Sequence, residues 1–104
     1  MNTLDHTFSA LSDSTRRAII ARLVQGESSL SELAKPFDMS QTAVSKHVRV
    51  LSEAGLVNVT KRGRTRYCQL MPKPIKEAAD WLHVYETFWE NNLQALGRYL
   101  EEDT

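Results

Sequence analysis

Glycine, proline and cysteine are scarce in this sequence of 104 residues, which contains four, three and one of them. The lone cysteine, Cys68, excludes an internal disulfide and fits a reducing compartment. No apolar run approaches the length of a membrane-spanning helix, and the first residues lack the basic and then apolar pattern of a signal peptide. We therefore expect a cytoplasmic protein with no membrane partner, built as one domain over residues 1–104.

Catalytic motifs are also missing. The sequence has no glycine-rich phosphate loop, no nucleophile elbow and no convincing acid–base cluster. Four aromatic residues near the C-terminus could line a ligand pocket, but core or dimer packing is the more common use of such a stripe: Trp81, Tyr85, Phe88 and Trp89. The sequence therefore argues against an enzyme and gives no reason to expect a cofactor.

Positive and negative charges balance over the whole chain but not along it. Residues 1–34 carry a net charge of −1, residues 35–76 of +7 and residues 77–104 of −6. Chance clustering on a solvated surface is the weaker explanation for blocks of this size. A basic middle segment beside an acidic end indicates that the middle segment meets a polyanion.

Two short helices are predicted at the start of the chain. Leu4, Phe8 and Leu11 have helical spacing over residues 3–11, and Asp13 or Ser14 can cap a second helix that ends at Gly26. The second helix is expected to bury a stripe of four residues: Ile19, Ile20, Leu23 and Val24. Its arginines are expected to face outward: Arg16, Arg17 and Arg22.

A helix-turn-helix unit is predicted over residues 30–54. Ser29 and Glu32 have the spacing of a capping box, and Pro36 limits the length of the helix that follows. Ser40 can cap the next helix, which we place at residues 41–54 with Gly55 as its stop. The buried residues of the two helices are expected to be Leu30, Leu33, Ala34, Phe37, Val44, His47, Val48 and Leu51.

The outer face of the helix at 41–54 is polar and cationic until Glu53. Amide, hydroxyl and cationic side chains suit base edges and phosphates in a DNA major groove, where an acid would be repelled. By itself this pattern favours a solvated amphipathic helix, but the preceding capped helix, the short turn and the basic hairpin that follows favour DNA. The predicted contacts are Ser40, Gln41, Thr42, Ser45, Lys46 and Arg49.

A basic β-hairpin is predicted over residues 56–70. The segments 56–60 and 65–70 are rich in β-formers, and Gly63 between them can take the positive φ that a hairpin turn requires. Arg62 and Arg64 are the best candidates for contact with the DNA backbone or minor groove, followed by Lys61 and Arg66. A helix-turn-helix followed by a basic hairpin is a winged helix.

A single last helix is predicted from about residue 75 to 101, after Pro72 and Pro74. It is apolar on more than one side, so it needs more than one surface to bury against. The domain core provides one surface, and a second copy of the chain is the natural other one. The resulting fold class is mainly α with a small β-hairpin, a winged helix-turn-helix.

The remaining reactive side chains have ordinary interpretations. His47 borders the buried side of its helix and is expected to be packed or hydrogen-bonded. Asp80 and His83 lie three residues apart and could bind a metal at a dimer interface, although a surface ion pair is favoured because two ligands are too few for a closed zinc site. Cys68 is expected to be a small strand hydrophobe.

The sequence resembles the ArsR/SmtB-type winged-helix transcriptional repressors of bacteria, most strongly in SELAKPFDMSQTAVSKHVRVLSEAGLV and GRTRYCQL. The resemblance implies a homodimer built on the first and last helices, with the helix at 41–54 in the major groove and the hairpin on flanking DNA. In such a dimer the two recognition helices would lie about 34 Å apart and favour an inverted-repeat operator. The implied interface residues are Leu4, Phe8, Leu82, Tyr85, Trp89, Leu93 and Leu96.

The sequence departs from the metal-sensing members of this family. Those members have paired cysteines in the first helix of the helix-turn-helix unit, where this chain has SELAKPFD, or Asp and His pairs on the last helix, where it has only Asp80 and His83. We therefore expect no bound metal and do not transfer metal sensing to this chain.

The predicted function is that of a sequence-specific DNA-binding transcriptional regulator, a dimeric repressor of an inverted-repeat operator. Two alternatives stay open: a winged-helix protein-interaction module, and a metal-responsive repressor that uses Asp80 and His83. The inducing signal is unknown, and a small molecule at the aromatic dimer interface, a protein partner or concentration alone would each fit.

Overall fold

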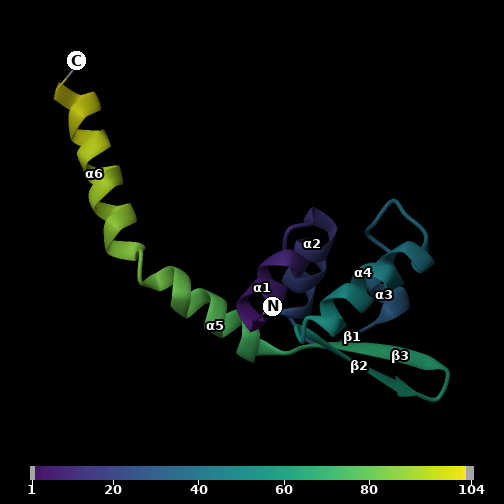
Figure 1. Cartoon of the computed structure of the whole chain (residues 1–104). Helices are drawn as coiled ribbons and strands as arrows, with labels where there is room; N and C mark the ends of the chain where they lie inside the picture. The colour runs from purple at the N-terminus through teal and green to yellow at the C-terminus, as the bar shows by residue number, and fades with distance from the viewer. Residues whose placement is uncertain (1, 103–104) are drawn as a thin grey trace.

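The computed structural model describes residues 2–102, which form short helices, a small sheet and a long C-terminal arm (Figure 1). The elements follow one another as α1 (Thr3–Ala10), α2 (Ser14–Leu23), β1 (Ser28–Ser29), α3 (Leu30–Ala34), α4 (Gln41–Glu53), β2 (Val57–Arg62), β3 (Thr65–Leu70), α5 (Pro72–His83) and α6 (Glu86–Glu102). The predicted winged helix-turn-helix is confirmed, because α3 and α4 are followed directly by the hairpin of β2 and β3.

Local capping sets where the helices begin. The side-chain oxygens of Asp13, Ser29 and Ser40 each accept a hydrogen bond from the backbone N–H three residues later, at 3.0, 3.2 and 3.1 Å. In the capping box predicted at Ser29, the Glu32 side chain would also accept a hydrogen bond from the Ser29 backbone N–H. The Glu32 carboxylate instead accepts a hydrogen bond from Lys35 Nζ at 2.7 Å. Helix α4 ends as predicted before Gly55, whose φ of +80° suits glycine.

The core lies between α2, α3, α4 and the sheet. Its buried residues are Ala10, Ile19, Leu23, Leu33, Val44, Val48, Leu51, Leu56, Val57 and Cys68, with Leu30, Ala34, Phe37 and Ile75 packed against them. The predicted stripes are therefore confirmed, with one exception. Val24 was expected to be buried but is 68% exposed, because it is the C-cap of α2 and lies beyond the last helical turn that packs on the core.

The sheet has one strand more than the sequence predicts. Strands β2 and β3 form the expected antiparallel hairpin around Gly63, whose φ is +64°. The short strand β1 pairs antiparallel with β3, so the strand order is β1-β3-β2. Two consecutive serines carry no β signal in the sequence. They adopt the extended conformation because the edge of β3 offers backbone partners, with Ser28 opposite Cys68.

The prediction of one continuous C-terminal helix was wrong. The helix divides into α5 and α6 around Val84 and Tyr85, and α5 already begins at Pro72. Prolines are tolerated there because the first backbone N–H groups of a helix have no intrahelical partner. Helix α5 packs on α1, where the rings of Phe8 and Trp81 meet edge to face with centroids 5.7 Å apart.

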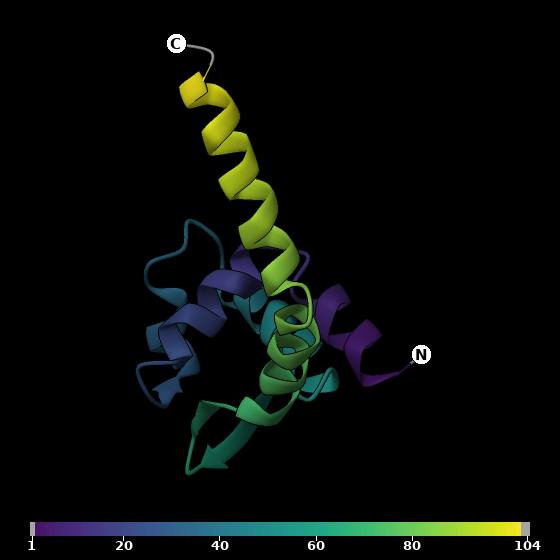
Figure 2. The same cartoon turned by 90° about the vertical axis from the view of Figure 1, so that its left-hand side faces the viewer.

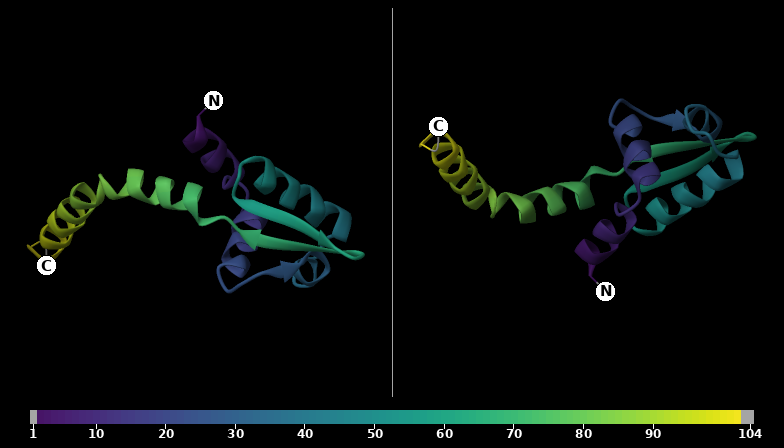
Figure 3. Two further views of the ribbon diagram at one scale, coloured as in Figure 1. Left: turned by 90° about the horizontal axis from the view of Figure 1, so that it is seen from below. Right: turned by 90° about the horizontal axis from the view of Figure 1, so that it is seen from above.

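Helix α6 extends away from the rest of the molecule as an arm, and the hairpin tip lies at the opposite end (Figures 2 and 3). The radius of gyration is 18.0 Å, well above the value of about 13 Å expected for a compact domain of this length. No helix within residues 2–102 is long and apolar enough to cross a membrane. The arm therefore holds its apolar side chains outside the domain core.

Candidate nucleic-acid interface

The predicted recognition helix α4 buries one side and exposes the other. Val44, Val48 and Leu51 are buried in the core. On the other side the side chains of Gln41, Thr42, Lys46 and Arg49 are exposed and Ser45 is half-buried. Ser40 caps the helix with its hydroxyl oxygen, as predicted, so its proposed DNA contact would use the remaining hydroxyl proton. The amphipathic pattern thus presents the predicted contact residues on one surface.

A polar contact on the inner side joins α4 to α2. His47 Nδ1 lies 3.3 Å from Arg16 Nη1 and 3.7 Å from the Asp13 carboxylate. Arg16 Nε also donates to the carbonyl of Ala10. The predicted packing of His47 is confirmed, whereas Arg16 is half-buried and does not face solvent as expected. No local sequence pattern indicates this role, because the partners of Arg16 are 6 and 31 residues away.

The Asp13 carboxylate responds to this contact. Its pKa is lowered, first because the backbone N–H of Arg16 donates to it and then because His47 and Arg16 lie nearby. The ionised carboxylate thus both caps α2 and faces the histidine of α4. These interactions fix the position of the recognition helix against the rest of the domain.

The cations of the hairpin are divided between its two faces. Cross-strand register pairs Val59 with Cys68, Lys61 with Arg66, and Arg62 with Thr65. Because side chains alternate along a strand, Lys61 and Arg66 lie on the face of buried Cys68, which is turned toward α4, and Arg62 lies on the other face.

On that other face Arg62 already has two interaction partners. Its guanidinium forms an ion pair with Glu27 and lies over the Tyr67 ring, 3.9 Å from the ring centroid. Arg62 was one of the two best candidates for DNA contact from the sequence. The structure instead brings Arg66 toward α4, leaves Arg64 exposed at the turn and holds Arg62 away from that surface.

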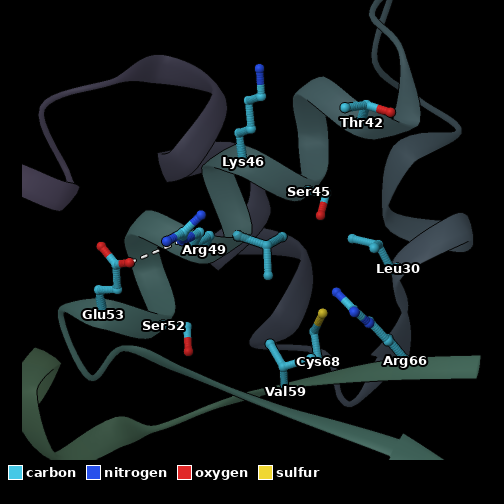
Figure 4. A pocket seen from close by; sticks show the side chains of 11 residues that line it. Leu30, Thr42, Ser45, Lys46, Arg49, Ser52, Glu53, Val59, Arg66 and Cys68 are labelled. Atoms are coloured by element: carbon cyan, nitrogen blue, oxygen red, sulfur yellow. Dashed lines mark hydrogen bonds and ion pairs between the residues drawn. The ribbon is translucent and has the colours of Figure 1, made fainter.

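A groove between α4 and the hairpin joins the two sets of predicted residues (Figure 4). We call it the α4–hairpin groove; its volume is about 360 Å³ and its lining is Leu30, Thr42, Ser45, Lys46, Val48, Arg49, Ser52, Glu53, Val59, Arg66 and Cys68. A neighbouring depression is lined by Gln41, Arg64 and Arg66 among others. Arg66 lines both, so the recognition helix and the wing form one continuous surface.

The cations of this surface differ in how they are neutralised. Arg49 Nε donates to Glu53 at 3.0 Å, on side chains that are 80% and 66% exposed. Within residues 2–102, Lys46, Lys61, Arg64 and Arg66 form no ion pair. Unpaired cations that repel one another are stabilised by an anionic partner, and a polyanion can meet all of them together.

Comparisons with known proteins agree with this geometry. A helix-turn-helix domain family matches residues 11–60. The HTH-type transcriptional regulator Rv2034 of Mycobacterium tuberculosis is 34% identical over 99 residues, covering 95% of this chain and 90% of its own length. A solved ArsR family transcriptional regulator superposes with a TM-score of 0.76 at 40% identity, covering 85% of this chain and 91% of that one. The transcriptional repressor SdpR of Bacillus subtilis is 26% identical over 86% of this chain and 100% of its own length.

The chain belongs to the ArsR/SmtB family. It is a DNA-binding transcriptional regulator and not an enzyme. Family membership confirms the winged fold and the regulatory function that the sequence predicts. It does not assign individual residues, so the DNA contacts named above stay predictions.

The two side chains of the metal alternative have other partners in this family member. Asp80 accepts from Lys76 Nζ at 2.9 Å, and His83 forms an ion pair with Glu86. Within residues 2–102, no three His, Cys, Asp or Glu side chains come together as a metal site would require. The surface ion pair between Asp80 and His83 that the sequence favoured is not the one observed, because each side chain has a different partner.

Cys68 is fully buried beneath the α4–hairpin groove. Burial raises the pKa of its thiol, because the thiolate would lose its hydration. Its expected role as a small strand hydrophobe is confirmed, since it belongs to the core cluster.

Proposed function

We propose that this ArsR/SmtB-family regulator is a homodimeric repressor that binds an inverted-repeat operator through α4 and the hairpin. The observation that carries the proposal is the surface on which Lys46, Lys61, Arg64 and Arg66 have no acidic partner among the described residues and lie beside the exposed polar face of α4. Lys46, Arg49 and Gln41 would contact base edges, whereas hairpin cations would hold phosphates or the minor groove.

The proposed dimer is supported by the arm. Large apolar side chains of α6 are more than half exposed: Phe88 61%, Trp89 58%, Leu93 65%, Leu96 54%, Tyr99 64% and Leu100 57%. Complete burial of one such side chain stabilises by about 1.5–3 kcal/mol, so this face has a strong tendency to find a partner. Leu82 and Tyr85 extend the face toward Phe8 of α1, which is itself 38% exposed.

A second copy of the chain is the proposed partner of this face. A two-fold axis through the arms would bring the same apolar residues of both copies together. An inverted-repeat operator requires in addition that this axis place the two copies of α4 about one helical turn of DNA apart. The name of the similar SdpR protein supports repression, since that protein is a transcriptional repressor.

The test is fluorescence anisotropy of the purified protein on labelled duplexes selected by it from a random-sequence pool. We expect one dimer per selected duplex, an inverted repeat in the selected sequences, and binding that survives physiological salt. Random duplex should bind weakly and lose binding steeply as salt rises. Equal binding to both duplexes would contradict sequence-specific recognition and favour the protein-interaction alternative.

Repression has its own test. In transcription from a promoter that overlaps the selected inverted repeat, added protein should reduce transcript and leave a promoter with a scrambled repeat unchanged. An increase in transcript at the intact repeat would show that the protein activates.

A further inference from the structure

We propose that the α4–hairpin groove is a binding site for a small amphipathic anion, such as an aryl carboxylate, and that its occupant excludes DNA. The exclusion rests on the proposed function, whereas the binding itself does not. The site would give this chain a sensor that needs neither a metal nor a second domain.

The floor of the groove is apolar. Leu30 from α3, Val48 from α4, and Val59 and Cys68 from the sheet line it. Val59 is 36% exposed although it stands on the inner face of the hairpin, opposite Cys68. Val48 and Cys68 are themselves only 4% and 0% exposed, so the apolar surface still open to water on this floor is that of Val59 and Leu30. An aromatic or alkyl group would cover these two side chains and remove their apolar surface from water, which a DNA phosphate at the rim would not do.

The rim of the groove is cationic and hydroxylic. Arg66 lies beside Leu30 and Cys68, and the Ser45 hydroxyl points into the space from α4 (Figure 4). Arg49 stands at the other end, where it already neutralises Glu53, the acid among the lining residues. Arg66 has no ion pair within residues 2–102, so we assign it as the anchor of an anionic head group.

The size of the groove also fits a small ligand. Its volume of about 360 Å³ lies within the range of about 300–1,000 Å³ typical of small-molecule sites, which are mostly apolar with a few placed polar groups. The same lining includes Thr42, Ser45, Lys46 and Arg49, the predicted DNA contacts. A ligand here would therefore compete directly with the operator, with no conformational change needed.

The first experiment measures binding without DNA. We would titrate ¹⁵N-labelled full-length protein with 1-naphthoate, and in parallel with its neutral near-isostere 1-naphthamide, and follow amide shifts by NMR. We expect saturable shifts at Ser45, Val59 and Arg66 and about tenfold weaker binding of the amide, the loss that one charge-assisted hydrogen bond implies. Equal binding of the two compounds, or shifts confined to the exposed aromatic residues of α5 and α6, would overturn the site.

Two variants in the groove and one matched control outside it test which residues bind 1-naphthoate. Arg66→Gln should weaken 1-naphthoate about tenfold, while Arg64→Gln, which removes an equal charge outside the groove, should leave it unchanged. Val59→Phe should abolish binding by filling the floor. Phenylalanine is a good strand former and this position is partly exposed, so the variant should keep its fold, which the spread of its amide shifts would verify. Equal effects of Arg66→Gln and Arg64→Gln would overturn the assignment of the anchor.

The second experiment measures exclusion. Added 1-naphthoate should raise the apparent Kd for a selected duplex in proportion to its concentration, while sedimentation shows an unchanged oligomeric state. If 1-naphthoate occupies the groove but leaves the duplex affinity unchanged, the exclusion is wrong. If the protein binds no duplex at all, the proposed function fails, and the NMR titration still decides whether the groove is a ligand site.

Discussion

Two arginines of the same hairpin should differ sharply in their contribution to DNA binding. Arg66 lies on the face turned toward α4 and has no acidic partner within residues 2–102, whereas Arg62 lies on the opposite face, paired with Glu27 and stacked on Tyr67. Arg66→Gln and Arg62→Gln remove the same charge at nearly the same place in the chain. We predict that only Arg66→Gln weakens binding to DNA substantially.

The size of the effect follows from counterion release. Each neutralised phosphate contributes about 0.9 to the slope of log affinity against log salt, so a dimer that loses two contacts loses about 1.8. Over a fourfold rise in salt, from about 50 to about 200 mM, the ratio of wild-type to Arg66→Gln affinity should therefore shrink about tenfold. For Arg62→Gln the slope should stay that of the wild type.

The assay is anisotropy on one selected duplex at five or more salt concentrations, with Arg62→Gln combined with Glu27→Gln as a control that preserves the local charge balance. Equal changes of slope for Arg62→Gln and Arg66→Gln would refute the assignment of the two faces. An unchanged slope for Arg66→Gln would refute the proposed phosphate contact.

Three further predictions test other parts of the molecule. Trp89→Asp should convert the proposed dimer to a monomer, as measured by sedimentation. The control Gln94→Asp, on the polar side of α6, should remain a dimer. If both variants are dimers, the interface lies elsewhere. Arg49→Ala should reduce discrimination between the operator and a variant at one base pair by about 1–3 kcal/mol, and unchanged discrimination at every position would mean that Arg49 reads no base. Because the pKa of Asp13 is lowered in the folded state, its ionised form stabilises the fold above its ordinary pKa, and this stability is lost as the pH falls through the lowered value. Asp13→Asn should therefore flatten the pH dependence of the free energy of unfolding below about pH 4, and an unchanged acid limb would contradict this.

Local signals in the sequence were enough for the winged helix. Side-chain caps at Asp13, Ser29 and Ser40, glycines at positions 55 and 63, and the change from helical to alternating periodicity after residue 55 each act within a few residues. Such short-range interactions can be predicted without tertiary information. For this reason the helix-turn-helix and the hairpin lie close to their predicted bounds.

The wrong predictions concern features of the structure that have no local signal in the sequence. Strand β1 forms because β3 offers it a partner, and Arg16 is drawn inward by the carbonyl of Ala10 and by His47. The break between α5 and α6 has no sequence signal, since neither glycine nor proline occurs between residues 75 and 96. Val24 fits the helical stripe by spacing but lies past the last packed turn of its helix.

The sequence by itself determined which side chains make up the proposed DNA-binding surface, because their chemistry and their spacing along α4 and the hairpin are local properties. Only the tertiary structure decided which of them act together. The register of the hairpin turns Arg66 toward α4 and Arg62 away from it, and the packing of the sheet beneath α4 creates the groove with its apolar floor. The separation of Arg62 and Arg66 onto opposite faces follows from the local hairpin register, but which face meets α4 depends on the packing of the helix on the sheet, a contact that no local pattern of charge or hydrophobicity encodes.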